Sequence, residues 1–417
     1  MEKSGKFRLT SLERNWILYD VGNSAFVLMV ATLIPIFFNA LAAAGGLSSV
    51  EYLAYWGYAS SAVTIITAVL SPILGTVADT KGFKKPIFIL CVFVGIVGCC
   101  AMGAVSAWLP FLVIFVIAKV GFSGSLVFYD SMLSDVTTPE RMDEVSSRGY
   151  AWGYIGSCVP FVVCLGLVLG AGSIGISQMT ALNLALLLTA AWWLLTTLPL
   201  LKSYKQLYYV EVEKHAVRQS FARIGHTLRH LPEDKQVFWF LLAFFCYIDG
   251  VYTIIDMATA YGTALGLDTT GLLLALLVTQ IVAFPSALVF GRLSNKYPSA
   301  KLIPVCIAAY AGIAVFAFFL TRQWQFWVLA VIVGMFQGGV QALSRSHFAK
   351  IIPPEKSGEY FGLFDICGKG ASFLGTMIVS VGSQLTGSAN VGVGSLIVLF
   401  IVGFVLFRVS CRQSETA

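Results

Sequence analysis

The sequence predicts an all-α membrane protein with about twelve transmembrane helices, arranged in two pseudo-symmetric bundles of about six each. Three observations lead to this prediction: the composition, the spacing of apolar runs and an internal repeat. Of the 417 residues, 58% are hydrophobic and only 12% are charged, and the mean hydropathy is +0.83. Soluble domains rarely reach such values. Crossing the bilayer takes about 20 apolar residues, because backbone polar groups in lipid must be satisfied within a helix.

Apolar runs bounded by charged residues, glycine and proline mark the expected spans. In the first half of the chain they lie at about 14–42, 52–78, 86–106, 109–134, 146–171 and 178–201. In the second half they lie at about 236–264, 269–292, 301–320, 325–350, 358–384 and 390–410. We therefore expect an N-terminal bundle at 1–201, a linker at 202–235 and a C-terminal bundle at 236–417.

Basic residues are distributed unevenly between the two sides of this predicted bundle. If the amino terminus lies in the cytoplasm, all but three of the 27 Lys and Arg residues fall in cytoplasmic segments. The exceptions are Arg322, in an outer loop, and Lys119 and Lys369, within spans. This asymmetry follows the positive-inside rule and predicts that both termini are cytoplasmic. It also accounts for the net charge of +6 without nucleic acid as a partner.

The polar segment at 202–235 contains a helical pattern. Its apolar residues recur at spacings of four and three: Val217, Phe221, Ile224, Leu228 and Leu231. Basic residues occupy the other faces, so the pattern predicts an amphipathic helix on the inner membrane surface. A solvated charged loop is the alternative, because Gly225 weakens a helix.

The two halves repeat one another with a shift of about 215 residues. Gly75 aligns with Gly291, and Asp79 aligns with Asn295. The same shift superimposes later residues: Pro139, Glu140, Arg141, Glu144 and Gly153 on Pro354, Glu355, Lys356, Glu359 and Gly368. An even number of spans per half makes this a parallel repeat, related by an axis along the membrane normal.

Residues 75–85 form a motif between the second and third expected spans. Gly75 allows two helices to approach closely, and Asp79 can accept hydrogen bonds from the amino terminus of a neighbouring helix. The lysines hold the loop at the inner face. Such a contact locks one conformation and breaks in the other, which predicts a gating role; an ordinary basic turn is the alternative. The gating residues are Gly75, Asp79, Gly82, Lys84 and Lys85.

This motif resembles the signature loop of the major facilitator superfamily, which implies the major facilitator fold. Phe83 stands where that family usually has a basic residue. The second copy of the motif, at 291–295, has Asn295 in place of the carboxylate. We therefore expect the second gate to be weaker than the first.

Further motifs in both halves resemble the vacuole-effluxer-like branch of the superfamily. They lie at 19–26 (YDVGNSAF), 247–256 (YIDGVYTIID), 337–346 (QGGVQALSRS) and 359–362 (EYFG), followed by Gly368 and Lys369. The resemblance implies a transporter related to the fungal vacuolar amino-acid effluxers and their bacterial relatives. It implies secondary transport of an amino acid or a related metabolite by alternating access, in the direction of efflux.

Several ionisable side chains fall inside the expected spans. Each costs at least about 2.5–3.5 kcal/mol at mid-bilayer, so it needs a partner, a water-filled cavity or a neutral form. Polar stripes of this kind occur on four helices: Asp20 and Asn23; Lys119 and Asp130; Asp249, Tyr252 and Asp256; Asp365 and Lys369. The amides Gln337 and Gln341 can line the same cavity, although amides at helix interfaces also serve as packing aids.

We interpret these residues as a solute site between the halves. Lys119 and Lys369 offer positive charge to an anionic group such as a carboxylate, while Asp249 or Asp20 faces an amine or carries a coupling proton. Asp130 and Arg345 align in the repeat near inner helix ends and are assigned to the gate. The alternative, for this pair and for Asp365 with Lys369, is that the charges only fix helix packing.

Other functions were considered from the same residues. Residues 121–124 (GFSG) match the pattern of intramembrane serine proteases, but a serine nucleophile needs a base and none of the four histidines lies convincingly within a span. A receptor or scaffold with this fold is a second alternative. Among transporters, an exporter of amphiphilic compounds or lysolipids is the alternative, because the 31 Phe residues can line an apolar cavity.

Cofactor and metal sites are not expected. The nine cysteines lack paired spacing, and there is no phosphate-binding loop for a nucleotide. The expected protein is not an enzyme. Its expected partners are a small-molecule solute, the lipid bilayer and, if transport is coupled, protons. We expect a monomer in the plasma membrane, with the vacuolar membrane as the less favoured alternative.

Overall fold

The computed structural model describes residues 7–211, 225–227 and 229–416. The amphipathic helix expected at 217–231 therefore lies largely outside the described residues. Within the helices, the side chains of the following residues are also outside the description: 49, 50, 53, 259, 260, 263, 264, 269, 270, 273, 369–373 and 414–416. The predicted site residue Lys369 is among them.

Helices make up nearly all of the described chain. The first half contains α1 (Ser11–Ala31), α2 (Leu33–Ala44), α3 (Ser49–Ala78), α4 (Lys84–Met102), α5 (Trp108–Ser131), α6 (Leu133–Val136), α7 (Met142–Leu169) and α8 (Gln178–Ser203). The second half contains α10 (Lys235–Ala264), α11 (Thr269–Leu293), α12 (Ser299–Phe318), α13 (Gln323–Ile351), the 3-10 turn η1 (Pro354–Lys356), α14 (Ser357–Thr386), α15 (Ala389–Gly394) and α16 (Ile397–Thr416).

Eleven helical segments of the described chain are long and apolar enough to cross a membrane. In the first of them, α1 and α2 form a single segment that bends at Thr32. The twelfth expected span, at 358–384, coincides with α14, which is not among the eleven. The all-helical membrane fold is therefore confirmed, whereas the count of twelve stays a prediction.

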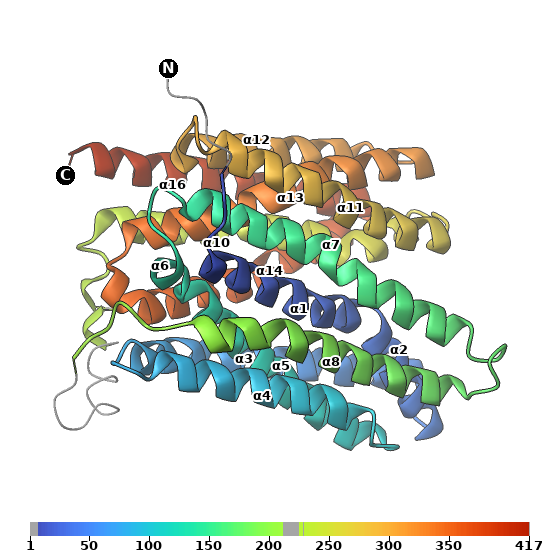
Figure 1. The fold of residues 1–417 in the computed structure, drawn as a ribbon. Coiled ribbons are helices and arrows are strands. Elements are labelled where there is room, and N and C mark those ends of the chain that lie inside the picture. The colour runs from blue at the N-terminus through green and yellow to red at the C-terminus, as the bar shows by residue number, and fades with distance from the viewer. Residues whose placement is uncertain (1–6, 212–224, 228, 417) are drawn as a thin grey trace.

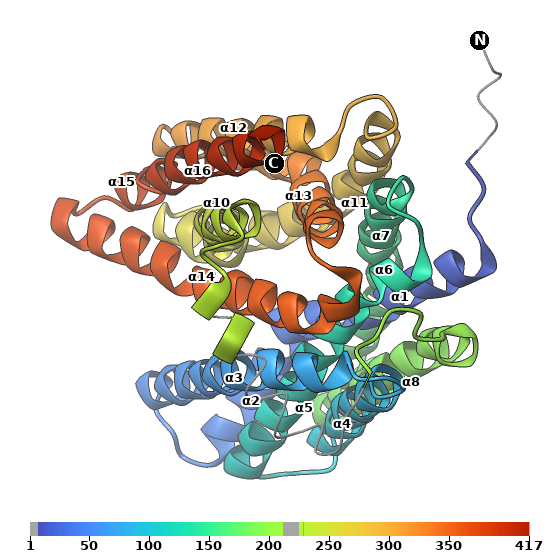
Figure 2. The same ribbon diagram turned by 90° about the vertical axis from the view of Figure 1, so that its left-hand side faces the viewer.

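The two halves of the chain form two bundles that lie side by side (Figures 1 and 2). Figure 2 looks onto the end of the molecule where α1 begins and α16 ends, with α10–α16 above and α3, α4, α5 and α8 below. We call this the amino-terminal end and the opposite one the far end. Between the bundles, α3 packs on α14, and α7 packs on α11 and α13.

Local sequence determines where the helices begin. Thr10 and Glu13 form a capping box at the start of α1, because each side chain bonds the backbone amide of the other. Ser48 and Glu51 do the same for α3. At the far end, the Asp268 carboxylate accepts from the Gly271 amide at 2.6 Å and caps α11. These polar caps lie outside the apolar runs that form the spans.

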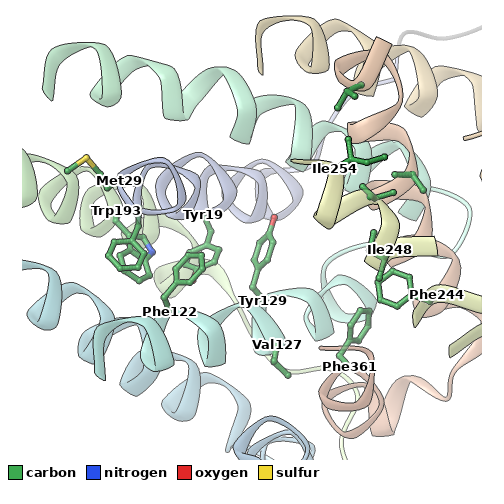
Figure 3. Close-up of a cluster of buried hydrophobic side chains, with 14 of the residues drawn as sticks. Tyr19, Met29, Phe122, Val127, Tyr129, Trp193, Phe244, Ile248, Ile254 and Phe361 are labelled. Atoms are coloured by element: carbon green, nitrogen blue, oxygen red, sulfur yellow. The ribbon is translucent and has the colours of Figure 1, made fainter. Parts of the chain in front are cut away.

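Aromatic side chains fill the interior of each bundle. In the first half, Trp193 packs against Phe26 and Phe122, and Tyr19 packs against Tyr129. In the second half, Phe364 stacks on both Phe244 and Phe348. Figure 3 shows that Tyr19, Phe122 and Trp193 gather around α1, well separated from Phe244 and Phe361. The buried hydrophobic residues of the two halves nevertheless form one continuous cluster in the described chain.

Glycines permit the close approach of α3 and α14. A Cβ atom added to Gly75 would clash with the carbonyl oxygen of Gly358, and one added to Gly362 would lie 2.6 Å from Pro72 Cα. Both distances are far below van der Waals contact, so the backbones touch directly. This confirms that Gly75 allows two helices to approach closely and identifies α14 as the partner.

We predict that Gly75→Ala separates α3 from α14 at the amino-terminal end. The added methyl has no space beside the α14 backbone, and overpacking of this kind costs about 1–3 kcal/mol. The variant should melt at a lower temperature, and amides at 357–362 should exchange hydrogen for deuterium faster than in the unchanged protein.

The matched control is Gly57→Ala on the same helix. A Cβ atom at Gly57 meets nothing within 4 Å, so this substitution gains helix propensity without a clash. Equal melting temperatures and equal exchange in the two variants would contradict the close contact.

Candidate functional site

The first polar cluster lies at the amino-terminal end, where α3 meets α14. Asp79 follows the last residue of α3 and is 1% exposed. Its Oδ1 accepts a hydrogen bond from the Gly358 amide at 2.7 Å, and its Oδ2 accepts one from the Glu359 amide at 2.8 Å. These amides belong to the first turn of α14, where N–H groups lack helical partners and the helix dipole favours an anion. Asp79 therefore makes the predicted type of contact; its gating role stays a prediction.

Lys84 lies beside Asp79 and is fully buried. Its Nζ donates to Ser357 Oγ at 2.8 Å and lies 3.4 Å from Asp135 Oδ2 and 3.8 Å from Asp79 Oδ1. This differs from the expectation that Lys84 and Lys85 together hold the loop at the membrane face. Lys84 is instead enclosed by two carboxylates of its own half and a hydroxyl of the other. Lys85 is half-buried.

Asp135, on the short helix α6, is a member of this cluster that sequence reasoning missed. It accepts hydrogen bonds from the Tyr204 hydroxyl at 2.5 Å and from the Leu207 and Tyr208 amides at 3.0 and 2.9 Å. Burial and the neighbouring Asp135 raise the pKa of Tyr204 well above its usual value, so the hydroxyl stays protonated and donates. The sequence does not indicate that Asp135 binds the linker, because an acidic residue just after a span is common in ordinary loops.

The beginning of the linker is attached to the same loop. The Val210 amide donates to Asp79 O at 2.8 Å. Gln206 accepts from the Gly82 amide at 3.0 Å and donates to Ala78 O at 3.1 Å. Gly82 has a φ of +80°, a conformation that favours glycine, which explains its place in this turn. The start of the linker thus binds the predicted gate loop at its beginning, at Ala78 and Asp79, and again at Gly82.

The second copy of the motif makes a different contact. Asn295 Nδ2 donates to Glu144 Oε2 at 2.8 Å, at the start of α7. Glu144 also binds the Arg148 guanidinium. Asn295 and Glu144 are the repeat equivalents of Asp79 and Glu359. One side-chain hydrogen bond therefore stands where the first copy has two bonds to helix amides; whether this gate is weaker stays a prediction.

Arg345 provides the most extensive polar contact between the halves. It belongs to α13, is 2% exposed and extends into the first bundle. Its NH1 donates to Asp130 Oδ1 at 2.9 Å, and its Nε and NH2 donate to Ser146 Oγ and Ser146 O at 2.9 and 3.0 Å. NH1 also lies 3.7 Å from Asp20 Oδ2. Asp130 and Arg345, both assigned to the gate from the sequence, thus pair across the two halves, with Ser146 as a partner that the sequence did not indicate. Their gating role stays a prediction.

Asp20 and Asn23, both predicted to contact solute, are buried next to Arg345. Asp20 is 6% exposed, and Asn23 donates to Tyr19 O at 3.1 Å and, more weakly, to Asp20 Oδ1 at 3.5 Å. In this conformation Asp20 therefore faces a protein cation. Its roles toward solute or proton stay predictions.

Asp249 lies in the second bundle, between α10 and α14, and is fully buried. Its Oδ1 accepts from the Gly375 amide at 2.8 Å and from Thr253 Oγ1 at 3.2 Å. Its Oδ2 has no hydrogen-bond partner among the described residues. A Cβ at Gly375 would lie 2.6 Å from Asp249 Oδ1, so the glycine is required for this approach. Asp249 thus binds α14 through one oxygen, and its other oxygen has no hydrogen-bond partner in the described part of the chain.

Lys119 and Asp256 carry opposite charges and belong to different halves. Asp256, on α10, is exposed and interacts electrostatically with Lys119 on α5. Lys119 Nζ also lies 4.8 Å from the centre of the Phe122 ring. Tyr252, one turn before Asp256, is half-buried. Asp256 thus interacts electrostatically with two other predicted site residues, Lys119 and Tyr252. That these residues bind solute stays a prediction.

Asp365, on α14, makes a hydrogen bond to the first half of the chain and not only contacts within α14. Ser71 Oγ, on α3, donates to Asp365 Oδ2 at 2.7 Å. The expected partner Lys369 lies one turn further on α14, with a side chain outside the description.

The glutamines lie on α11 and α13 in the second bundle. Gln280 and Gln337 line a cavity of about 60 Å³ whose other walls are almost entirely apolar. Gln337 Oε1 has no hydrogen-bond partner among the described residues, and Gln341 is 9% exposed. The cavity is much smaller than typical ligand pockets of about 300–1,000 Å³, so in this conformation it has room for a few waters.

The serine of the GFSG segment does not meet a histidine in the described chain. Ser123 is buried on α5. The buried His347, near the carboxyl-terminal end of α13, has its Nδ1 3.1 Å from Ser299 Oγ. His347 thus has a different serine as its neighbour, on α12.

Comparison with known proteins is consistent with this arrangement. The model of the family described as "Vacuole effluxer Atg22 like" matches residues 11–416. An MFS-type transporter of Bacillus subtilis, YxiO, is 41% identical over 98% of this chain and 97% of its own. Autophagy-related protein 22 of Coccidioides immitis is 25% identical over 65% of this chain, which spans about half (51%) of that longer relative.

Two solved structures share the fold. The human organic anion transporter MFSD10 superimposes with a TM-score of 0.72 and 14% identity, covering 95% of this chain and 99% of the other. The major facilitator superfamily transporter FucP, in its outward conformation, gives a TM-score of 0.71 and 16% identity, covering 96% and 97%. These likenesses confirm the major facilitator fold.

We predict that Lys84→Met destabilises the protein strongly, although the side chains are similar in size. The substitution leaves Asp79 and Asp135 buried without their shared cation, and breaking a buried ion pair costs about 3–5 kcal/mol. The melting temperature of purified protein in lipid nanodiscs measures the loss.

Lys85→Met is the matched control, because this neighbour is half-buried and not enclosed by the two carboxylates. Its melting temperature should stay close to that of the unchanged protein. If both variants lost the same stability, the distinction between the two lysines would be wrong.

Proposed function

The chain belongs to the vacuole effluxer Atg22-like family, and from that membership we propose that this major facilitator transporter moves a small zwitterionic or anionic solute by alternating access. An amino acid or a related metabolite, carried in the direction of efflux, is the solute class we favour. The proposal rests on one observation above all: Lys119 of the first half and Asp256 of the second are near enough to interact electrostatically.

The charges fit a zwitterion in a specific way. Lys119 belongs to the first half and Asp256 to the second, and Asp256 is exposed rather than sealed in its bundle. A solute carboxylate can pair with the lysine while its ammonium group pairs with the aspartate. Each half then holds one end of the solute, so binding favours the conformation in which the halves approach.

Orientation follows from the distribution of basic residues. We infer that the amino-terminal end faces the cytoplasm, in a plasma membrane, because nearly all lysines and arginines outside the spans lie on that side. The polar contacts of Asp79, Lys84 and Arg345 then close the cytoplasmic end. The conformation described above would accordingly have its solute site accessible from outside.

The two loop motifs, at Asp79 and Asn295, bear on how access to the solute site alternates between the two sides of the membrane. Because the repeat is parallel, both copies of the loop motif lie at the same end of the molecule. Opening the cytoplasmic end requires the Asp79 contact and the Asn295 contact to break together, along with the Arg345 contact. The inferred cycle therefore has one cooperative closure at this end rather than two independent ones.

A coupling proton is the finer part of the proposal. Asp249 is a fully buried carboxylate with one unused oxygen, next to the amide of Gly375. A protonated Oδ2 would remove the cost of a buried charge. Asp249 is therefore our first candidate for the coupling group and Asp20 the second, since Arg345 already compensates Asp20.

An exporter of amphiphilic compounds remains the second candidate function. The observation that favours it is the apolar cavity beside Gln280 and Gln337 in the second bundle. An amphiphile would place its apolar part there and its polar head near Asp256, two residues from the lining residue Ile254.

We predict that Lys119→Ala and Asp256→Asn each reduce solute uptake by purified protein in proteoliposomes by at least about tenfold, the effect of losing 1.4 kcal/mol of binding. A panel of labelled amino acids and of lysolipids serves as the substrates. Asp249→Asn should instead preserve affinity and flatten the pH dependence of uptake.

Lys296→Ala is the control, because Lys296 is exposed in the loop between α11 and α12. If Lys119→Ala and Asp249→Asn both left uptake, its pH dependence and the solute affinity unchanged, the assigned site would be wrong. Transport of lysolipids but of no amino acid would favour the second candidate.

A further inference from the structure

The first bundle contains a cage for a cation, and Arg345 of the second bundle fills it. The guanidinium carbon lies 4.7 Å from the Trp16 ring centre, 5.4 Å from that of Tyr129 and 4.3 Å from that of Tyr150. The NH1 atom lies 2.9 Å from Asp130 Oδ1 and 3.7 Å from Asp20 Oδ2. The five cage residues come from α1, α5 and α7, and all belong to the first half: Trp16, Asp20, Tyr129, Asp130 and Tyr150.

Two of the cage residues bind each other directly. Trp16 stacks on Tyr129 with ring centres 4.3 Å apart, and its Nε1 donates to Tyr129 O at 3.0 Å. This pair belongs to α1 and α5, both in the first half. Two of the three aromatic rings are therefore packed against each other by contacts within the first half.

The cage carries more negative charge than the single positive charge of Arg345 neutralises. Two carboxylates share a single guanidinium nitrogen, and Asp365 lies close enough to Asp130 to add to the negative potential. Asp20 Oδ2 contacts Arg345 as an ion pair at 3.7 Å, beyond hydrogen-bond distance, and interacts with the Tyr129 hydroxyl. Among the described residues neither atom has a hydrogen-bond partner within 3.5 Å, so Asp20 Oδ2 can accept a shorter bond from another cation.

One glycine forms the floor of the cage. A Cβ at Gly149 would lie 2.9 Å from Asp20 Oδ2, 3.1 Å from Arg345 NH2 and 3.1 Å from the Trp16 ring. A side chain at this position would occupy the space of the guest. Aromatic faces combined with carboxylates are the chemistry with which proteins recognise organic cations.

We propose that the cage formed by Trp16, Asp20, Tyr129, Asp130 and Tyr150 is a binding site for an organic cation, an ammonium or guanidinium group of a solute. Arg345 occupies the site while the amino-terminal end is closed. When the halves separate there, Arg345 withdraws with the second bundle and the cage receives the solute cation. The proposal rests on the alternation of the proposed function, because only that movement empties the cage.

Competition between Arg345 and the solute cation for the cage would give transport a direction. Closure of the amino-terminal end drives Arg345 back into the cage, and the tethered guanidinium displaces the bound cation. The solute must then move toward the far end, where Lys119 and Asp256 lie. Arg345 thus acts as a positioning residue that clears the site on each closure.

The test uses full-length Arg345→Ala protein in lipid nanodiscs, which has an empty cage. Methylguanidinium is the probe, and methylurea, its uncharged counterpart of similar shape, is the control. We expect methylguanidinium to raise the melting temperature in a saturable way and methylurea to leave it unchanged. Asp130→Asn in the Arg345→Ala background should weaken methylguanidinium binding at least tenfold.

The floor of the cage provides matched variants. In the Arg345→Ala background, Gly149→Ala should abolish the shift, because the methyl group occupies the binding space. Gly166→Ala, on the same helix with nothing within 4 Å of an added Cβ, should leave the shift intact. Equal binding with Gly149→Ala and Gly166→Ala, or with and without Asp130→Asn, would overturn the proposal.

A second measurement is decisive if Arg345→Ala does not fold. In the unchanged protein, methylguanidinium competes with Arg345, so hydrogen–deuterium exchange at 342–351 should increase with methylguanidinium but not with methylurea. Identical exchange with both probes would overturn the proposal. Neither measurement involves transport, so a protein that transports but fails these tests refutes the cage alone, and the reverse outcome refutes the transport proposal alone.

Discussion

Burial of charge in a membrane is the constraint on which the rest of this structure depends. Arg345 and Lys84 are almost completely enclosed, and an isolated buried ion costs several kcal/mol even after relaxation. Arg345 is compensated by carboxylates of the opposite half, a contact that exists only while the two bundles touch at the amino-terminal end. Lys84 is compensated by Asp79 and Asp135 of its own half, and its bond to Ser357 crosses the same interface. For Arg345, closure and charge compensation are therefore one event. Opening exchanges these protein partners for water, so the two conformations can differ little in free energy although many bonds break.

The repeat explains where the principal contact lies. Asp130 and Arg345 occupy equivalent positions in the two halves, and they bind each other. Two equivalent residues can meet in this way only near the pseudo-symmetry axis, as in the self-complementary contact of a two-fold dimer. Divergence at such a position is favourable, because identical charges would repel at the axis, whereas an acid and a base attract. The loss of the carboxylate at Asn295 has the same consequence further out: Asn295 donates to Glu144, while Asp79 accepts from helix amides. The fold is symmetric, and its polar contacts are made complementary by sequence differences between the copies.

The helical membrane fold, the close approach at Gly75 and the Asp79 hydrogen bonds could all be predicted from the sequence. These features depend on local pattern: apolar run length, a missing side chain, and a carboxylate next to a helix start. The positions of Asp135 and Trp16 could not be predicted. Asp135 binds the linker start, and Trp16 stacks against Arg345, through contacts that depend on how separate helices are rotated and how deeply they are inserted. A sequence shows which face of a helix is polar but does not show which helix that face meets. For the same reason Asp20 could be identified as buried charge, whereas its proximity to Arg345 had to come from the structure.

Distances along α5 separate the two charged sites. Lys119 precedes Asp130 by eleven residues on one helix, which corresponds to about 16 Å at 1.5 Å per residue. A small zwitterion, whose ammonium and carboxylate groups are bonded through a single carbon, cannot reach across such a span. The cage at Asp130 and the Lys119–Asp256 pair would therefore hold a solute at successive stages rather than together. On the proposed mechanism the ammonium group passes from the carboxylates of the first half to Asp256 of the second. Arg345 then fills the vacated cage, which keeps both carboxylates compensated while the solute leaves.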